Sequence, residues 1–128
     1  VPLEDLPKGG EARVAQEVRL HFAKSGGLLW RNNVGVLVND NDVPVRYGLA
    51  NESKGMNKRI KSSDLIGINP VKITDDMVGM TIGQFVAIET KKPGWCFKGT
   101  DRETAQLAFI ELILSKGGLA GFNNGVGN

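Results

Sequence analysis

Cysteine and histidine are almost absent from this chain, which has one of each, Cys96 and His21, in 128 residues. A single cysteine excludes an internal disulfide and a thiolate cluster for a metal. A single histidine excludes histidine-rich zinc sites, and it leaves Ser-His-Asp chemistry only if His21 itself serves. We therefore expect any catalytic metal to be held by carboxylate oxygens, which favours Mg²⁺ or Mn²⁺ over zinc.

Long apolar runs are missing as well. No stretch approaches the roughly 20 residues of a membrane-spanning helix, and the opening Val1-Pro2-Leu3-Glu4-Asp5 is not typical of a signal peptide. The glycine pairs lack the strand-to-helix spacing of a phosphate-binding loop. We therefore expect no membrane partner and no nucleotide cofactor, and the lone cysteine indicates a cytoplasmic protein.

A large excess of charge is also missing, since the formal net charge is +2, so no global field argues for nucleic acid. The distribution of the basic residues says more, because residues 54–61 contain no acid and directly precede Ser62-Ser63-Asp64. Such a run is a solvated loop in the simplest interpretation, but beside an active site it would contact a phosphate backbone. The candidate phosphate contacts are Arg31, Arg46, Lys54, Lys58, Arg59, Lys61 and Lys92.

The apolar pattern predicts an α/β fold in one domain, preceded by a loose arm over residues 1–10. A first helix is expected over residues 11–24, where Val14, Val18 and Phe22 recur at helical spacing. A second helix begins at a capping box formed by Thr100 and Glu103. Its predicted buried stripe consists of Ala105, Ala108, Phe109, Leu112 and Ile113.

Four apolar runs predict strands, which gives the order α-β-β-β-α-β and a small mixed sheet flanked by helices. The strands are expected at residues 28–38, with an interruption at Asn32-Asn33, and at 64–68, 84–91 and 119–122. Residues 39–42 predict a turn, 43–61 a long functional loop, and 71–82 a connection in which Asp75-Asp76 starts a turn of helix rather than a second metal site.

Glu89-Thr90-Lys91 ends the apolar run of residues 85–88 and is the most informative motif. Because side chains alternate along a strand, Glu89 and Lys91 share one face and Thr90 points away. The simplest interpretation is a salt bridge at the end of a strand. The alternative is a site for phosphodiester cleavage, in which the carboxylate binds Mg²⁺ and the ammonium steadies hydroxide or the charged phosphorane.

Asp64 supplies a second carboxylate. If its strand pairs antiparallel with residues 84–91, Asp64 lies opposite Glu89 and the two can share an ion. Glu11 lies on the inward face of the first helical turn and could add a third oxygen through water, although a first-turn glutamate is often only a partner of the helix dipole. Lys91 would then orient or deprotonate the attacking water and neutralise charge on the phosphate.

With these residues in place, the chain resembles the PD-(D/E)XK nuclease superfamily, and more narrowly a stand-alone VRR-NUC domain of phages and bacteria. The resemblance covers nearly the whole sequence. Its matching stretches are Glu11 with Val14 and Val18, residues 30–35, 46–49, 63–67, 85–92, 100–106 and 117–121. Ser63-Asp64 stands where the superfamily has Pro-Asp, a change that removes no chemical group from the site.

The resemblance implies a restriction-endonuclease-like core and a Mg²⁺- or Mn²⁺-dependent DNA endonuclease. It implies that Asp64, Glu89 and the backbone carbonyl of Thr90 bind the metal and that Lys91 is the catalytic lysine. Gln106 matches a polar position that faces the active site, and Glu11 matches the acid of the first helix. Relatives of this kind resemble Holliday-junction resolvases, so a homodimer that acts on branched DNA, in a bacterial cell or a phage-infected host, is expected.

Two other functions remain open at this point. The chain could be a non-catalytic DNA-binding module with the same fold, or a monomeric nuclease that acts on flaps or linear ends. The intact Asp64, Glu89 and Lys91 argue against the first of these, because a site that had lost its function would be free to lose them.

Overall fold

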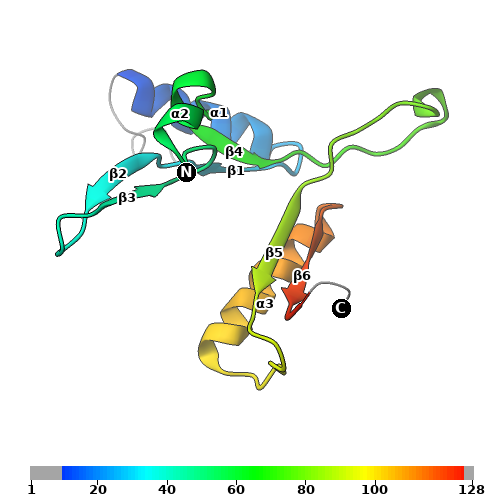
Figure 1. The fold of residues 1–128 in the computed structure, drawn as a ribbon. Helices are drawn as coiled ribbons and strands as arrows, with labels where there is room; N and C mark the ends of the chain where they lie inside the picture. Colours follow the sequence, from blue (N-terminus) through cyan, green and yellow to red (C-terminus); the bar gives the residue numbers. More distant parts are fainter. Residues whose placement is uncertain (1–9, 126–128) are drawn as a thin grey trace. The chain divides into compact units, whose positions relative to one another are not determined.

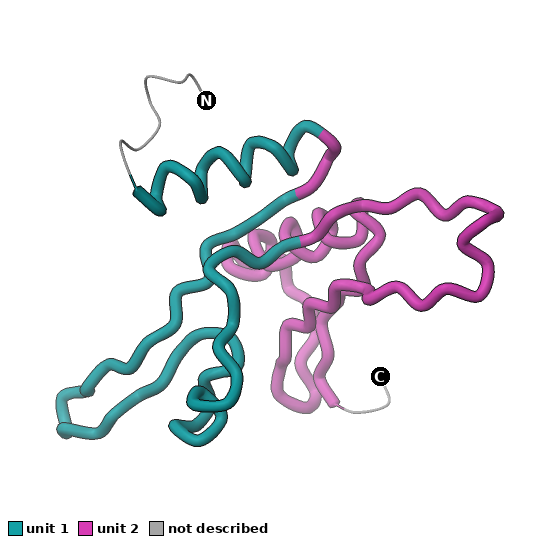
Figure 2. The backbone as a smooth tube through the Cα atoms, turned by 90° about the horizontal axis from the view of Figure 1, so that it is seen from above, with its two compact units in different colours: residues 1–24, 28–67 teal, residues 25–27, 68–128 magenta. Residues whose placement is uncertain are grey.

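The computed structural model describes residues 10–125, in which the chain forms two compact units (Figure 2). One comprises residues 1–24 and 28–67, and the other comprises residues 25–27 and 68–128. The predicted arm lies outside the described residues except for Gly10, where the first helix begins. No helix among residues 10–125 is long and apolar enough to cross a membrane.

The elements form a mixed α/β arrangement of helices and small sheets (Figure 1), which confirms the predicted class. In chain order they are α1 (Gly10–Ala23), β1 (Leu28–Arg31), β2 (Gly35–Val38), β3 (Pro44–Tyr47), α2 (Lys54–Arg59), β4 (Leu65–Ile68), the 3-10 turn η2 (Asp75–Met77), β5 (Val86–Thr90), α3 (Asp101–Ser115) and β6 (Leu119–Asn123).

Helix α1 confirms the predicted helix over residues 11–24 with slightly shifted ends, and it packs on β1 within the first unit. Nε of Arg19 donates to the carbonyl of Leu29 at 3.0 Å and so ties the helix to the strand. Val18 and Phe22 are half-buried, but Val14 is 58% exposed. The predicted apolar stripe is therefore correct toward the C-terminal end of α1 and wrong at Val14, nearer its N-terminal end.

Strands β1 and β4 pair with each other. The N–H of Asn32, just past β1, donates to the carbonyl of Asp64 at 2.8 Å, just before β4. At the other end, a Cβ added to Gly67 would lie 1.8 Å from the carbonyl oxygen of Leu28. Glycine at position 67 is therefore what allows the two backbones to approach so closely.

Strands β2 and β3 form an antiparallel hairpin in which Gly35 pairs with Tyr47 and Val38 with Pro44. The predicted turn at residues 39–42 is confirmed, since the side chain of Asn39 accepts from the N–H groups of Asn41 and Val43, both at 2.9 Å. The predicted interruption after residue 31 is also confirmed, because β1 and β2 belong to different sheets.

The long loop predicted over residues 43–61 is wrong, because β3 and α2 both lie within it. Each element is too short to show a clear period: β3 has four residues and α2 has six. Local hydrogen bonds define them instead. The hydroxyl of Ser53 caps α2 by accepting from the N–H of Met56 at 3.0 Å.

In the second unit, β5 runs parallel to β6, and α3 packs against both (Figure 1). Glu89 pairs in register with Phe122 and Thr90 with Asn123. The predicted capping box is confirmed, since the hydroxyl of Thr100 accepts from the N–H of Glu103 at 3.1 Å and the Glu103 side chain accepts from the N–H of Thr100 at 3.3 Å. The predicted strands near residues 64–68, 84–91 and 119–122 are confirmed with shifted ends.

The predicted buried stripe of α3 is mostly wrong. Ile113 is buried as expected, but the other buried residues of the helix are Glu103 and Ile110, and Phe109 is 42% exposed. Ala105, Ala108 and Leu112 are exposed as well. Leucine and isoleucine occur on several sides of α3, so the apolar period alone did not select the face that packs on β5 and β6.

The pairing predicted between the strand after Asp64 and the strand before Lys91 is not found among residues 10–125. There β4 pairs with β1, and β5 pairs with β6. The sequence between β4 and β5 contains only η2 and no tight hairpin turn. Without such a turn, alternation of side chains tells which face of a strand is apolar but does not choose the partner strand.

Candidate functional site

Glu89, Lys91 and Gln106 form one hydrogen-bonded chain in the second unit. Nζ of Lys91 donates to Oε1 of Gln106 at 2.8 Å, and Nε2 of Gln106 donates to Oε1 of Glu89 at 2.8 Å. Nζ of Lys91 lies 4.0 Å from the same Glu89 oxygen. The predicted common face of Glu89 and Lys91 is thus confirmed, and an amide from α3 joins the two charges.

Backbone pairing fixes the strand end that carries these charges. The N–H of Lys91 donates to the carbonyl of Asn123 at 2.8 Å, so the ladder between β5 and β6 continues one residue past Thr90. The side chain of Thr90 is exposed, on the face of β5 that Val86 and Ile88 share. Gln106 comes from the second turn of α3, whose start is set by the capping box.

Aromatic rings surround the ammonium of Lys91. Its Nζ lies 5.3 Å from the centroid of the Trp95 ring and 5.7 Å from that of Phe122. The side chain of Lys91 is only 15% exposed, whereas that of Glu89 is 40% exposed. Lys91 is therefore held away from bulk water, whereas the Glu89 side chain is partly open to solvent.

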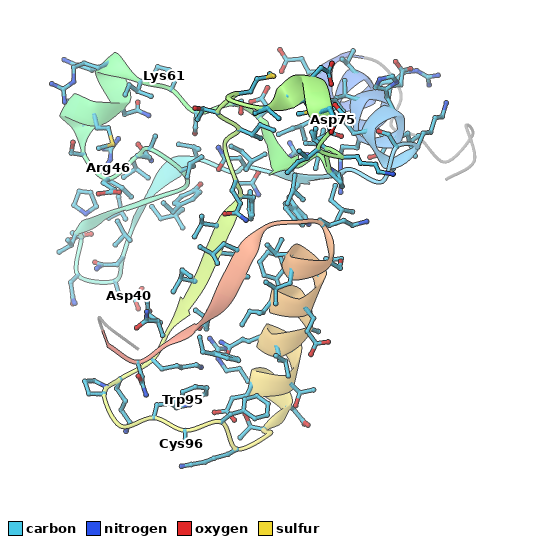
Figure 3. The ribbon with its side chains drawn as sticks, turned by 90° about the vertical axis from the view of Figure 1, so that its right-hand side faces the viewer. Asp40, Arg46, Lys61, Asp75, Trp95 and Cys96 are labelled. Carbon is cyan, nitrogen blue, oxygen red and sulfur yellow. The ribbon has the colours of Figure 1, made fainter. Side chains whose placement is uncertain are left out.

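A carboxylate on α3 supports the loop that carries Trp95, the loop labelled at Trp95 and Cys96 in Figure 3. Oε2 of Glu103 accepts from Nε1 of Trp95 at 2.8 Å, and Oε1 accepts from the N–H of Lys98 at 2.9 Å. These bonds, above all the one from Lys98, lower the pKa of Glu103, while desolvation acts in the opposite direction. Glu103 is thus a charged residue at pH 7 that ties residues 95–100 to α3.

Asp64 and Glu11 are brought together in the first unit, where both are exposed and line a cavity of about 360 Å³. Arg31, a predicted phosphate contact, lines the same cavity, as do Arg19 and Gln16. Two carboxylates and two guanidinium groups around one cavity could bind a cation, a phosphate group, or both.

Asn32 holds the segment that carries Asp64. Its Nδ2 donates to Oγ of Ser62 at 2.8 Å and to the carbonyl of Ser63 at 2.9 Å, and its Oδ1 accepts from the N–H of Leu49 at 3.3 Å. Oγ of Ser62 in turn donates to the carbonyl of Leu49 at 2.7 Å. The side chain of Asn32, at the predicted strand interruption, therefore holds the residues that lead into Asp64 and β4.

The metal ligands inferred from the sequence come from both units: Asp64 and Glu11 from the first, Glu89 and Thr90 from the second. Within the described residues, no three His, Cys, Asp or Glu side chains gather to hold a metal ion. The donor atoms are nevertheless of the right kind, since carboxylate oxygens are preferred by Mg²⁺ and Mn²⁺.

The predicted phosphate contacts differ in their surroundings. Nε and Nη2 of Arg46 donate to the carbonyl and Oδ1 of Asn51 at 2.9 and 2.7 Å. Asn51 is buried, so Arg46 has a structural role in the hairpin. Nζ of Lys61 donates to Oδ1 of Asn57 at 2.7 Å. The remaining candidates are exposed: Arg31, Lys54, Lys58, Arg59 and Lys92.

Sequence reasoning missed Trp95, Phe122, Glu103 and Asn32 as supports of the site. The capping box gave Glu103 a local role only, and no spacing rule relates the rings at 95 and 122 to Lys91. Cys96 is exposed and His21 packs edge-on against Phe22, with ring centroids 5.7 Å apart, so neither joins the site.

Comparison with known proteins adds no name to these residues. No family model, no curated protein and no solved structure matches the chain.

Proposed function

We propose that this protein is a Mg²⁺- or Mn²⁺-dependent DNA endonuclease with a restriction-endonuclease-like core. The observation that supports it best is the bridge from Glu89 through Gln106 to Lys91. A salt bridge at a strand end would need neither the amide between the charges nor the two aromatic rings near the ammonium. A catalytic lysine beside a metal-binding carboxylate needs this kind of fixed placement.

In this proposal, the carboxylates of Asp64 and Glu89 are metal ligands, with the carbonyl of Thr90 as a further oxygen ligand and Glu11 acting through water. The carboxylate oxygens of the exposed Asp64 and the partly exposed Glu89 suit a hard divalent cation. When bound, the ion would polarise the scissile phosphate and lower the pKa of a water ligand.

The residues of the chain then act around the reacting phosphate. As an ammonium, Lys91 orients the attacking water and neutralises charge that grows on the phosphate oxygens; only as a neutral amine would it take the proton of the water itself. The water oxygen bonds to phosphorus and gives up its proton to solvent or to that amine, the bond to the leaving sugar oxygen breaks, and that oxygen takes up a proton from solvent. Gln106 keeps the ammonium of Lys91 and the carboxylate of Glu89 in fixed positions during these steps.

The proposed substrate is branched DNA such as a four-way junction, and the proposed active form is a homodimer. A two-fold dimer can present two active sites to opposed strands of a junction. Exposed cations at Arg31, Lys54, Lys58, Arg59 and Lys92 would contact backbone phosphates without reading sequence. Lys61 and Arg46 would add to this surface while keeping their bonds to Asn57 and Asn51.

The test is cleavage of a labelled four-way junction with Mg²⁺ or Mn²⁺ by the parent protein and by the Asp64→Ala and Lys91→Ala variants. Both variants should lose activity by on the order of 10²–10³-fold, as when a charge-stabilising group is removed. Asp75→Ala and Lys98→Ala are matched controls that remove the same charges elsewhere and should cleave normally. Either site variant cutting as well as the parent would make the assignment wrong.

The same assay separates the other two functions. Binding of the junction without cleavage under any metal would indicate the non-catalytic module. A monomer by light scattering at the working concentration, together with cleavage of flaps or linear ends, would replace the junction resolvase by a monomeric nuclease.

A further inference from the structure

We infer that Trp95 is a positioning residue for Lys91: its ring holds the lysine ammonium in the orientation from which it donates to Gln106. The inference rests on the proposed function for its catalytic consequence, but the placement of Lys91 can be measured without any activity.

The ring of Trp95 attracts the ammonium electrostatically. The face of an aromatic ring carries partial negative charge, and a cation within about 6 Å of the ring centroid is stabilised, more strongly when water is excluded. Nζ of Lys91 meets this distance at both Trp95 and Phe122, at 5.3 and 5.7 Å. At 15% exposure, the side chain of Lys91 is shielded from most of the solvent that would weaken the attraction.

Trp95 is itself fixed by contacts of both its side chain and its backbone. Its Nε1 donates to Glu103 at 2.8 Å, its N–H donates to the carbonyl of Lys92 at 3.1 Å, and its carbonyl accepts from Nδ2 of Asn124 at 3.0 Å. Its ring also packs on Phe122, with centroids 4.9 Å apart and planes at 39°. These contacts from α3, the loop and the end of β6 fix the ring from several sides.

These contacts define the position of the Lys91 ammonium. An unrestrained lysine side chain loses considerable rotamer entropy when it is ordered. Gln106 supplies one hydrogen bond that orders it, and the two rings restrict where the ammonium can go. Because effective catalysis depends on placement to within about 1 Å, loss of the Trp95 ring should act on the reaction through Lys91, without any contact between Trp95 and the DNA.

Three substitutions separate this role from general packing. Trp95→Leu removes the ring, and Trp95→Phe keeps a ring but loses the Nε1–H bond to Glu103. Phe97→Leu is the matched control, because Phe97 packs on the same Trp95 and Phe122 rings, at 6.4 and 5.9 Å, and is itself half exposed. Thermal unfolding of each variant checks that it is folded at the assay temperature.

The first measurement is the NMR position of the Lys91 ε-methylene protons, assigned by their absence in Lys91→Ala. Ring currents from Trp95 and Phe122 should shift them upfield in the parent, in Trp95→Phe and in Phe97→Leu, and the shift should be reduced in Trp95→Leu. The second is junction cleavage. Trp95→Leu should lower kcat by on the order of 10²-fold with little change in the KM for DNA or in the metal concentration for half-maximal rate.

Trp95→Phe should stay within about fivefold of the parent, since phenylalanine also offers a ring face, and Phe97→Leu should match the parent. Unshifted ε-methylene protons in the folded parent would overturn the inference. So would a Trp95→Leu variant that cleaves like the parent, or a Phe97→Leu variant that loses as much activity. If the parent cleaves no DNA with any metal, the nuclease proposal fails. The ε-methylene shift then decides by itself whether Trp95 positions the Lys91 ammonium.

Discussion

Gln106 is the residue on which the relation between Glu89 and Lys91 depends. Its side-chain amide accepts from the ammonium of Lys91 with its oxygen and donates to the carboxylate of Glu89 with its nitrogen, and both bonds are 2.8 Å long. The two partners also determine which end of the amide is oxygen. Gln106 therefore stabilises both charges and links them, while Nζ of Lys91 lies 4.0 Å from Oε1 of Glu89.

Gln106→Leu should remove both bonds and allow Lys91 to move closer to Glu89 than the present 4.0 Å. We expect a loss of about 1–3 kcal/mol in the free energy of unfolding, from two half-buried hydrogen bonds to charged groups. Cleavage of a junction should fall on the order of 10²-fold through misplacement of Lys91. Gln84→Leu is the control, because Nε2 of Gln84 donates to the carbonyl of Gly117 at 3.1 Å, a bond that involves neither Glu89 nor Lys91. Equal losses of activity in both variants would contradict the bridging role.

The sequence predicts some of these residues and not others, because the spacing of residues encodes only local geometry. Alternation along a strand places Glu89 and Lys91 on one face, and the structure confirms it. Gln106 was expected at the site through a family resemblance, not from a spacing rule. Trp95 and Phe122 reach Lys91 from a loop and from β6, and contacts between segments so far apart leave no short-range signal in the sequence.

The pairing of β1 with β4 depends on glycine at position 67. In Gly67→Ala, the new Cβ would lie 1.8 Å from the carbonyl oxygen of Leu28, so the strands must separate. We expect the free energy of unfolding to fall by about 1–3 kcal/mol, as when extra atoms are forced into a packed region. Gly55→Ala, in α2 with open space at its Cβ, should instead stabilise the protein by about 0.5–1 kcal/mol. Urea unfolding of both variants checks the opposite signs.

The start of α3 should make stability depend on pH. The N–H of Lys98, followed by Nε1 of Trp95 and the N–H of Thr100, lowers the pKa of Glu103 in the folded chain below its ordinary 4.5. The folded state therefore gains stability from Glu103 above pH 4.5, and this gain is lost as the pH falls through the lower, folded pKa. Glu103→Gln should be less stable than the parent at pH 7, and the difference should shrink toward pH 3. A constant difference across this range would contradict the assignment.

Short elements mark the limit of the sequence interpretation of the fold. The long helices were expected correctly because α1 has 14 residues and α3 begins with a capping box. β3 and α2 were missed because neither is long enough to show a period. The partner of β4 was also predicted wrongly, since only a hairpin turn such as the one at residues 39–42 ties two strands together in the sequence.

The charge of the whole molecule is nearly balanced, so the proposed affinity for DNA must depend on where the cations lie. The net charge is +2, yet α2 presents Lys54, Lys58 and Arg59 as exposed side chains with no acid in the same stretch. Such a cluster binds phosphates by releasing counterions, which makes affinity fall with salt and gives no preference for base sequence.

Replacing Lys54, Lys58 and Arg59 together by alanine should weaken junction binding and flatten its salt dependence. The slope of log K against log salt should fall by about 0.9 for each phosphate contact that is lost. Replacing Lys24, Lys72 and Lys98, also exposed, removes the same total charge from other places and should leave the slope nearly unchanged. Fluorescence anisotropy measures the salt slopes of both triple variants. Each variant also carries Asp64→Ala, so that the junction is bound but not cleaved. Equal slopes for the two triple variants would show that α2 is only a solvated segment, as the simplest interpretation of its charges has it.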